Sequence, residues 1–205
     1  MGLISNGTTL LDAGALDSAA GSGAMTLIKT LTASSSANLQ FLNGASSVVF
    51  DGTYKEYQFH CISIHPASDG EPLTFQVDTG TNTNFNIATT NTFFRARHNE
   101  GDTISSLAYV TSYDQAQGTA FIRMNGGVGN AADECCSMIL TIYEPANTTF
   151  VKHYTFTGNN YQDNSGSENL FSAGYFNTTT ALTRIQFKMG SGNIDSGTIK
   201  MYGIS

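Results

Sequence analysis

Apolar and polar residues alternate strictly along several short segments of this 205-residue sequence, and this alternation limits the fold more than any other feature. It is clearest in segments 73–78, 135–143 and 181–189. Successive side chains of a strand point to opposite faces, so each segment can bury one face of a β-sheet. The residues predicted to share an apolar face are Leu73, Phe75 and Val77; Cys136, Met138, Leu140 and Ile142; and Ile185, Phe187 and Met189.

Weaker β-like patterns and turn signals fill the rest of the chain after residue 25. The weaker candidates are 26–32, 38–42, 54–64, 85–89, 92–97, 107–113, 119–124, 150–157, 170–176 and 198–204. Asn-Gly and Asp-Gly pairs between them, at 43–44, 51–52, 69–70 and 125–126, favour tight hairpin turns. Pro66, Pro72 and Pro145 fall at predicted strand ends. About a dozen short strands predict an all-β protein, an antiparallel jelly-roll-like sandwich rather than a closed barrel.

The composition agrees with β structure and argues against nucleic acid as a partner. Hydrophobic residues make up 40% of the chain, which is enough for a core, and charged residues only 12%. Thr, Ser, Asn and Gly, which suit sheet surfaces and turns, supply the remaining polarity. Nine basic residues face 16 acidic ones, giving a net charge of −7, whereas binding to phosphates needs a surplus of Lys and Arg.

The cysteines and the apolar runs predict a chain made in a reducing cytoplasm, with no membrane partner. The three cysteines cannot all pair within one chain, and Cys135 and Cys136 are neighbours, so we expect free thiols. The first residues lack a secretory signal pattern. No stretch approaches the ~18 apolar residues needed to cross a membrane.

Residues 1–24 differ from the rest, which forms the predicted sandwich domain 25–205. Small residues and glycine give this segment little to bury, so we expect a flexible N-terminal arm used in assembly or attachment. Its apolar residues Leu10, Leu11 and Leu16 are predicted to dock on a neighbouring subunit. The alternative is a short helix over residues 10–20.

The sequence contains no recognisable catalytic, metal-binding or nucleotide-binding motif, so we predict no catalytic residue, no metal and no cofactor. No nucleophile elbow, zinc-binding helix motif or P-loop is present, and the glycines of 126–129 are predicted to form a loop. His60, His65, His98 and His153 are expected to have structural or surface roles rather than to bind a metal. The sequence does not show which side of its strand His60 faces. Oxygen donors cluster at 78–84 and 163–168 but miss the EF-hand spacing, so solvated loops are expected.

Sugar binding remains open on the sequence. The acidic residues lie mainly in turn-like segments, and the chain has no Trp to form a flat sugar platform. Tyrosines could serve instead, and the candidate glycan contacts are Tyr109, Tyr113 and Tyr161, with Tyr175 as a further one. A glycan-cleaving enzyme using paired carboxylates is the least favoured hypothesis.

Several segments of the chain resemble a group of phage proteins. These are 173–181 (AGYFNTTTA), 185–189 (IQFKM) and 192–204 (GNIDSGTIKMYGI), together with 3–9 (LISNGTT) and 113–121 (YDQAQGTAF). They resemble uncharacterised virion structural proteins of marine and freshwater tailed phages, including cyanophages. The terminal segment 192–204 is the most specific of them. The resemblance implies a virion component without carrying over any site, and it leaves head and tail locations open.

From the resemblance we expect a non-enzymatic structural protein of a tailed-phage virion, synthesised in the host cytoplasm. It would be displayed as a capsid decoration or cement protein, or as a tail-fibre or baseplate appendage. Its expected partners are further copies of itself, by analogy as a homotrimer, and the major capsid or tail proteins. The alternative is a receptor- or carbohydrate-binding module at the tail tip that recognises a host surface glycan.

Overall fold

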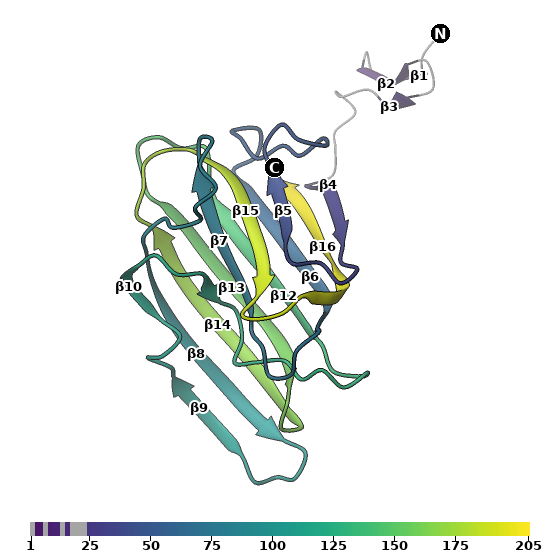
Figure 1. Cartoon of the computed structure of the whole chain (residues 1–205). Helices are drawn as coiled ribbons and strands as arrows, with labels where there is room; N and C mark the ends of the chain where they lie inside the picture. Colours follow the sequence, from purple (N-terminus) through teal and green to yellow (C-terminus); the bar gives the residue numbers. More distant parts are fainter. Residues whose placement is uncertain (1–2, 6–7, 13–14, 17–23) are drawn as a thin grey trace.

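The structure is a computed structural model that describes residues 3–5, 8–12, 15–16 and 24–205, and every regular element in these residues is a β-strand. Residues 25–204 form a sandwich of two antiparallel sheets, as the alternation predicted (Figure 1). The longer sheet contains β4 (Met25–Thr32), β6 (Glu56–Pro66), β8 (Thr89–Asn99), β9 (Ser105–Tyr109), β10 (Gln115–Gly118), β12 (Cys136–Tyr143), β13 (Lys152–Gln162), β14 (Gly166–Phe176) and β16 (Ile194–Ile204). The shorter sheet contains β5 (Leu39–Leu42), β7 (Leu73–Thr79), β11 (Ile122–Arg123) and β15 (Leu182–Met189).

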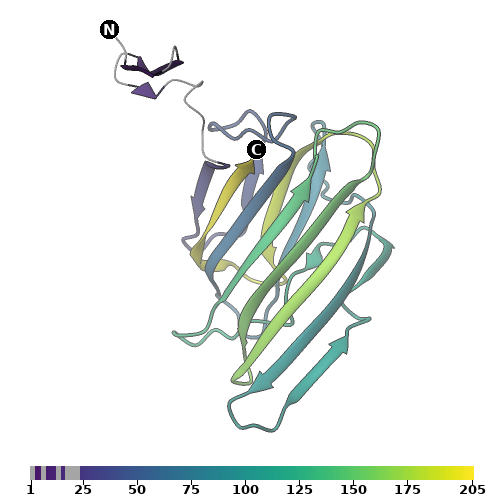
Figure 2. The same cartoon turned by 180° about the vertical axis from the view of Figure 1, so that it is seen from behind.

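The strand pairing is nested, as in a jelly roll. Strands β4 and β6 flank β16 in the nine-stranded sheet, β5 and β7 flank β15 in the four-stranded sheet, and β8 pairs with β14. From β4 to β8 the chain thus alternates between the two sheets, and β14 to β16 return in the same way. The consecutive neighbours β12, β13 and β14 widen the nine-stranded sheet beyond the four-stranded one (Figure 2).

Phenylalanines from both sheets meet in the core. Phe75 and Phe187 of the four-stranded sheet are fully buried, and so is Phe59 of the nine-stranded sheet. The ring centroids of Phe59 and Phe187 lie 5.6 Å apart, and Phe75 meets Phe156 edge-on at 6.0 Å. Each such aromatic pair adds about 0.5–1.5 kcal/mol beyond the burial of its area.

The predicted apolar faces of β7, β12 and β15 are confirmed, because all of their members are buried. Strand β7 differs in that its polar residues are buried as well. Loops cover its outer face: the Gln76 side chain donates to the carbonyls of Ile87 (3.2 Å) and Ala120 (3.1 Å), and the Asp78 carboxylate accepts from the Phe85 N–H (2.8 Å). The alternation therefore identified the strand and its core-facing side chains, but not the loops that bury its other face.

A β-bulge settles the orientation of His60. Ser63 has a φ of 51°, and the register of β6 with both of its neighbours shifts around this residue. As a result, Ile62 is exposed whereas Ile64 is fully buried, although residues two positions apart would share a face of a regular strand. His60 lies on the outer side with Ile62, and Cys61 faces the core.

Some of the weaker predictions were wrong in detail. Segment 85–89 is not a strand until Thr89, because Phe85 has a φ of 49° and its N–H bonds Asp78. Only Ile122 and Arg123 of 119–124 form a strand, and 107–113 continues as a strand only to Tyr109. The four Asn-Gly and Asp-Gly pairs do not close hairpins between neighbouring strands; all four lie in connections between the two sheets. The three prolines do lie at strand ends.

The described parts of the N-terminal segment form a small antiparallel sheet of β1 (Leu3–Ser5), β2 (Thr8–Asp12) and β3 (Ala15–Leu16). The alternative of a helix over residues 10–20 is wrong for 10–12 and 15–16, which are strands. Residues 17–23 of the predicted arm lie outside the described residues, as do the side chains of Leu10, Leu11 and Leu16.

All three cysteines are free, and two of them are deep in the core. Burial raises the pKa of the Cys61 and Cys136 thiols well above the usual value, so neither is a ready nucleophile.

Candidate functional site

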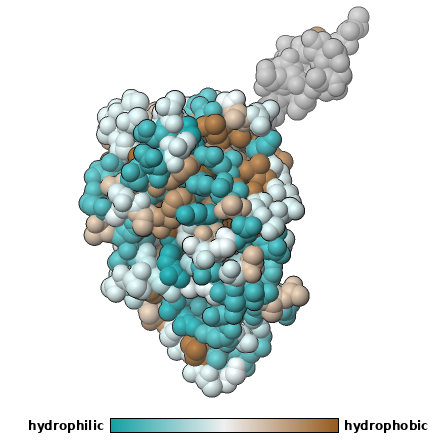
Figure 3. Space-filling view, viewed as in Figure 1, coloured by the Kyte–Doolittle hydropathy of each residue, from teal (hydrophilic) through white to brown (hydrophobic). Residues whose placement is uncertain are grey.

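The outer faces of the two sheets differ in character. Figure 3, viewed from the side of the four-stranded sheet, shows mainly hydrophilic and neutral residues with hydrophobic ones in small separate areas. On the nine-stranded sheet, in contrast, several large apolar side chains are exposed and share one row. Large exposed apolar patches on a soluble domain usually mark binding surfaces, so the outer face of the nine-stranded sheet is the candidate site.

The strand registers align this row across β9, β8, β14, β13 and β12. Tyr109 pairs with Phe94, Phe94 with Phe171, Phe171 with Thr157, and Thr157 with Ile139. We call Tyr109, Phe94, Phe171 and Ile139 the apolar row. The rings of Phe94 and Phe171 stack at a centroid distance of 5.2 Å and an angle of 12°, yet the two residues remain 41% and 39% exposed.

Two further rows follow along the strands. The first, which we call the threonine row, consists of Thr92, Ala173, Thr155 and Thr141. The second, which we call the tyrosine row, is made of Thr90, Tyr175, His153 and Tyr143. His153 meets the ring of Tyr175 at a centroid distance of 6.2 Å. Large rings at both ends and small side chains between them make this face concave.

Three adjoining hollows occupy this concave strip. One of about 420 Å³ lies between Phe94, Phe171 and Ile139, and one of about 380 Å³ shares Thr155 and Ala173 with it. A third hollow, of about 570 Å³, shares His153 with the second and ends at Phe150, which is 65% exposed. We call the three adjoining hollows together the trough; its central stretch, from Phe171 to Tyr175, is about 13 Å long at ~3.3 Å per residue.

The trough carries almost no charge. Among its described lining residues, Glu144, at the Phe150 end, is the one permanently charged group. The Lys55 ammonium lies 3.0 Å from its carboxylate, and together with a hydrogen bond from Asn147 it lowers the pKa of Glu144. The remainder of the lining is aromatic, aliphatic, hydroxyl or amide, with one imidazole from His153.

The three tyrosines predicted as glycan contacts do not come together. Tyr109 lies in the apolar row. Its hydroxyl donates a hydrogen bond to Asp114 at 2.6 Å, and this bond raises the pKa of Tyr109. Tyr161 stands beside Ser167 at the far end of β13 and donates to Glu100 at 2.9 Å. Tyr113 is half-buried, with the Arg123 guanidinium 4.2 Å from its ring centroid, so it is not free to stack on a ligand.

Sequence reasoning missed most of the trough. Phe94, Phe171 and Ile139 lie in predicted strands, but nothing in the sequence shows which strands become neighbours or in what register. Tyr175, the further tyrosine candidate, does line the trough. The available signal was the pair Phe93-Phe94: adjacent residues face opposite sides of a sheet, so one of two neighbouring rings must point away from the core.

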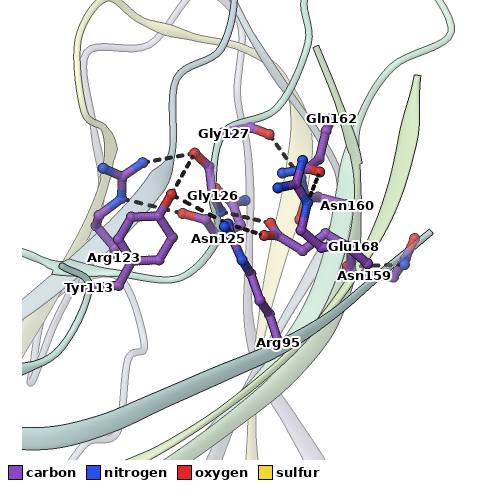
Figure 4. A network of polar contacts seen from close by, with 11 residues as sticks. Arg95, Tyr113, Arg123, Asn125, Gly126, Gly127, Asn159, Asn160, Gln162 and Glu168 are labelled. Atoms are coloured by element: carbon purple, nitrogen blue, oxygen red, sulfur yellow. Dashed lines mark hydrogen bonds and ion pairs between the residues drawn. The ribbon is translucent and has the colours of Figure 1, made fainter. Parts of the chain in front are cut away.

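A second cluster lies inside the sandwich (Figure 4). The Glu168 carboxylate is fully buried and accepts hydrogen bonds from Arg95 at 2.6 Å and from the Gly126 N–H at 2.9 Å. Arg123 donates to the Gly126 carbonyl at 2.8 Å, and Asn160 to that of Gly127 at 2.8 Å. The acid is thus neutralised and fixes the 125–127 loop against β14, which is a structural role.

The candidate ion-binding segments do not assemble into a cluster. The Asp78 carboxylate accepts from the backbone N–H groups of Thr79 (2.9 Å) and Phe85 (2.8 Å), which directs it into its own loop. Within the described ranges, no group of three or more His, Cys, Asp or Glu side chains is placed to hold a metal. The same ranges contain no helix of the length and hydrophobicity needed to cross a bilayer.

Comparison of the chain with family models, with curated proteins and with solved structures gives no match.

Proposed function

We propose that the protein is a non-enzymatic structural component of a tailed-phage virion, displayed on the particle as a capsid decoration or cement protein or as a tail or baseplate appendage. The proposal rests mainly on the resemblance to phage virion proteins, which is most specific in segment 192–204. This segment contains β16, which is hydrogen-bonded to β6 on one side and to β4 on the other. The segment that carries the resemblance is therefore an interior strand of the nine-stranded sheet, next to its edge strand β4.

The trough supports display on a particle as well. Many copies on one particle convert weak individual contacts into strong attachment through effective concentration, so a shallow open surface is sufficient for binding. We propose further copies of the chain, as a homotrimer, and the major capsid or tail proteins as partners. We propose attachment through residues 1–24, with Leu10, Leu11 and Leu16 as the contacts.

Gold labelling of purified particles tests the location. A specific antibody should label the particle, either over the whole head, which identifies a decoration protein, or at one pole, which identifies a tail appendage. Absence of the protein from purified particles, when it is present in the infected cell, would overturn the proposal. Particles assembled with a chain lacking residues 1–24 should carry little of the protein; normal incorporation would show that the arm does not attach it.

The trough favours a second function, that of a receptor- or carbohydrate-binding module at the tail tip. Aromatic rings beside hydroxyl groups are the side chains that stack on and hydrogen-bond to sugars, and here they line one hollow surface. A glycan array probed with the purified protein tests this function. No binding to any host glycan at high protein concentration would remove it, and would leave the structural role untouched.

A further inference from the structure

We infer that the trough on the outer face of the nine-stranded sheet binds an extended, uncharged oligosaccharide lying along β13 and β14. This inference deepens the receptor-binding function proposed above and rests on it. It adds the binding surface, the direction of the ligand and the charge class of the sugar.

The spacing of the rows suits a chain of sugar rings. Phe94 and Phe171 stand at one end of the central stretch and Tyr175 and His153 at the other, separated by the threonine row. One face of a pyranose ring is a patch of C–H groups that packs against an aromatic ring, whereas its edge carries hydroxyls. A ligand lying along the strands would thus meet a ring, then hydroxyls, then another ring.

Hydroxyl groups are available at the required positions. The Thr141 and Thr157 hydroxyls have no hydrogen-bond partner among the described residues, and the Thr155 hydroxyl lies 3.3 Å from that of Tyr143. A threonine hydroxyl both donates and accepts, so these groups can pair with sugar hydroxyls of either orientation. A purely apolar partner would leave the same hydroxyls without partners and would lose binding energy.

The charge distribution selects an uncharged sugar. Among the described lining residues, the central stretch contains no Arg or Lys to pair with a carboxylate or sulfate, and Glu144 at the Phe150 end is already paired with Lys55. The whole chain has a net charge of −7, which repels acidic saccharides at a distance. Sialylated, sulfated and uronic-acid chains should therefore bind more weakly than neutral chains of the same length.

Cross-strand stacking of Phe94 and Phe171 stabilises the sheet by itself. That role does not account for the hollow beside the rings, where the threonine row places Ala173 between Thr92 and Thr155. Nor does a second copy of the chain account for it. Protein interface cores are depleted in Ser and Ala and are closely packed, whereas this surface has Ala173 and three threonines in the middle row.

The test is calorimetric titration of the full chain with maltohexaose, cellohexaose and xylohexaose, and with an oligogalacturonate of equal length as the acidic probe. At least one neutral saccharide should bind, and the acidic probe should bind about tenfold more weakly or not at all. The variant Phe171→Ala should weaken neutral binding by about tenfold. The matched control is Leu107→Ala, which changes a more exposed apolar residue outside the trough and should leave binding unchanged.

A second variant separates loss of binding from loss of folding. Ala173→Gln fills the middle of the trough from an exposed position and removes no packed side chain, so it should abolish binding at unchanged thermal stability. If Ala173→Gln and Phe171→Ala bind as the wild type does, the trough is not the site, even where the array shows that the protein binds glycans. If instead sedimentation shows an oligomer that Phe171→Ala dissociates, and no saccharide binds, the face is a subunit interface and the inference is overturned.

Discussion

At the scale of single residues, the interior polar contacts matter more for stability than their number suggests. Glu168 has no exposed surface and its carboxylate is matched by Arg95, whose side chain is 18% exposed. A buried pair of this kind adds little net stability, but removing one partner leaves an uncompensated charge.

We expect Glu168→Ala to lower the free energy of unfolding by about 3–5 kcal/mol, because Arg95 and the Gly126 N–H both lose their acceptor. Guanidinium denaturation followed by circular dichroism measures the change. The double variant Arg95→Met/Glu168→Leu is the control and should cost clearly less, since no charge is stranded. Equal losses for both variants would show that packing, not charge pairing, holds this region.

His60 predicts a pH dependence of stability. Partial burial, and secondarily the Lys200 ammonium, lower the pKa of its imidazole below the usual value of about 6.5. The unfolded chain therefore takes up this proton at a higher pH than the folded chain. The free energy of unfolding is consequently unaffected by His60 above the pKa of the unfolded chain, and it falls as the pH drops from there towards the pKa of the folded chain.

Replacing His60 with Gln should reduce this loss. Thermal unfolding measured between pH 8 and pH 5 should show a smaller fall in Tm for His60→Gln than for the wild type, with little difference between the two at pH 8. Parallel pH profiles for the two proteins would show that His60 does not contribute to the dependence.

At the scale of elements, the paired irregularities of β6 and β16 decide which residues of β6 face the core. Gly197 has a φ of 115° and lies opposite the bulge at Ser63. A Cβ at Gly197 would lie 2.6 Å from the Ser63 carbonyl oxygen and 2.8 Å from the Ile64 Cα, both of them backbone atoms that cannot turn aside.

Gly197→Ala should therefore destabilise the sandwich by about 1–3 kcal/mol through strain and displacement of β6. Urea denaturation checks this value. Gly52→Ala is a suitable control, because a Cβ there has no neighbour within 4 Å and the backbone has no positive φ. A Gly197 variant as stable as the Gly52 variant would mean that the bulge relaxes at no cost.

The strands and their buried faces could be predicted from the sequence, because period-two alternation is a local signal. In β15, Ile185, Phe187 and Met189 are all buried, as expected. The cover over β7 could not be predicted, since it comes from two irregular segments, the connection after β7 around Ile87 and the segment around Ala120, which carry no periodic signal. The candidate site could not be predicted either, because it depends on contacts between residues far apart in the sequence. Each member of the apolar row lies on a recognisable strand, but the row exists only through the pairing of five strands.

At the scale of the whole molecule, the sandwich is closed by contacts between its first and last strands. Strand β16 lies between β6 and β4, and β15 lies between β7 and β5. These pairings join residues more than a hundred positions apart in the sequence, as in Met201 with Phe59.

Removing residues 194–205, which contain β16, should therefore unfold the body. Phe59 and Cys61 would lose one of their two neighbouring strands, and β4 would lose β16, its partner among the described strands. We expect a chain ending at residue 193 to be insoluble or to lack the cooperative thermal transition of the full chain. A soluble truncated chain with the wild-type transition would contradict this account.

The place of β16 between β4 and β6 also bears on how the protein is made in the cell. While a ribosome is still adding residues 194–204, β4 and β6 have already been synthesised, and each has a backbone edge that lacks its partner β16. Such edges invite pairing with other nascent chains. Closure of this part of the sheet must therefore await the synthesis of residues 194–204, and slow translation or crowded polysomes would favour aggregation over the native fold.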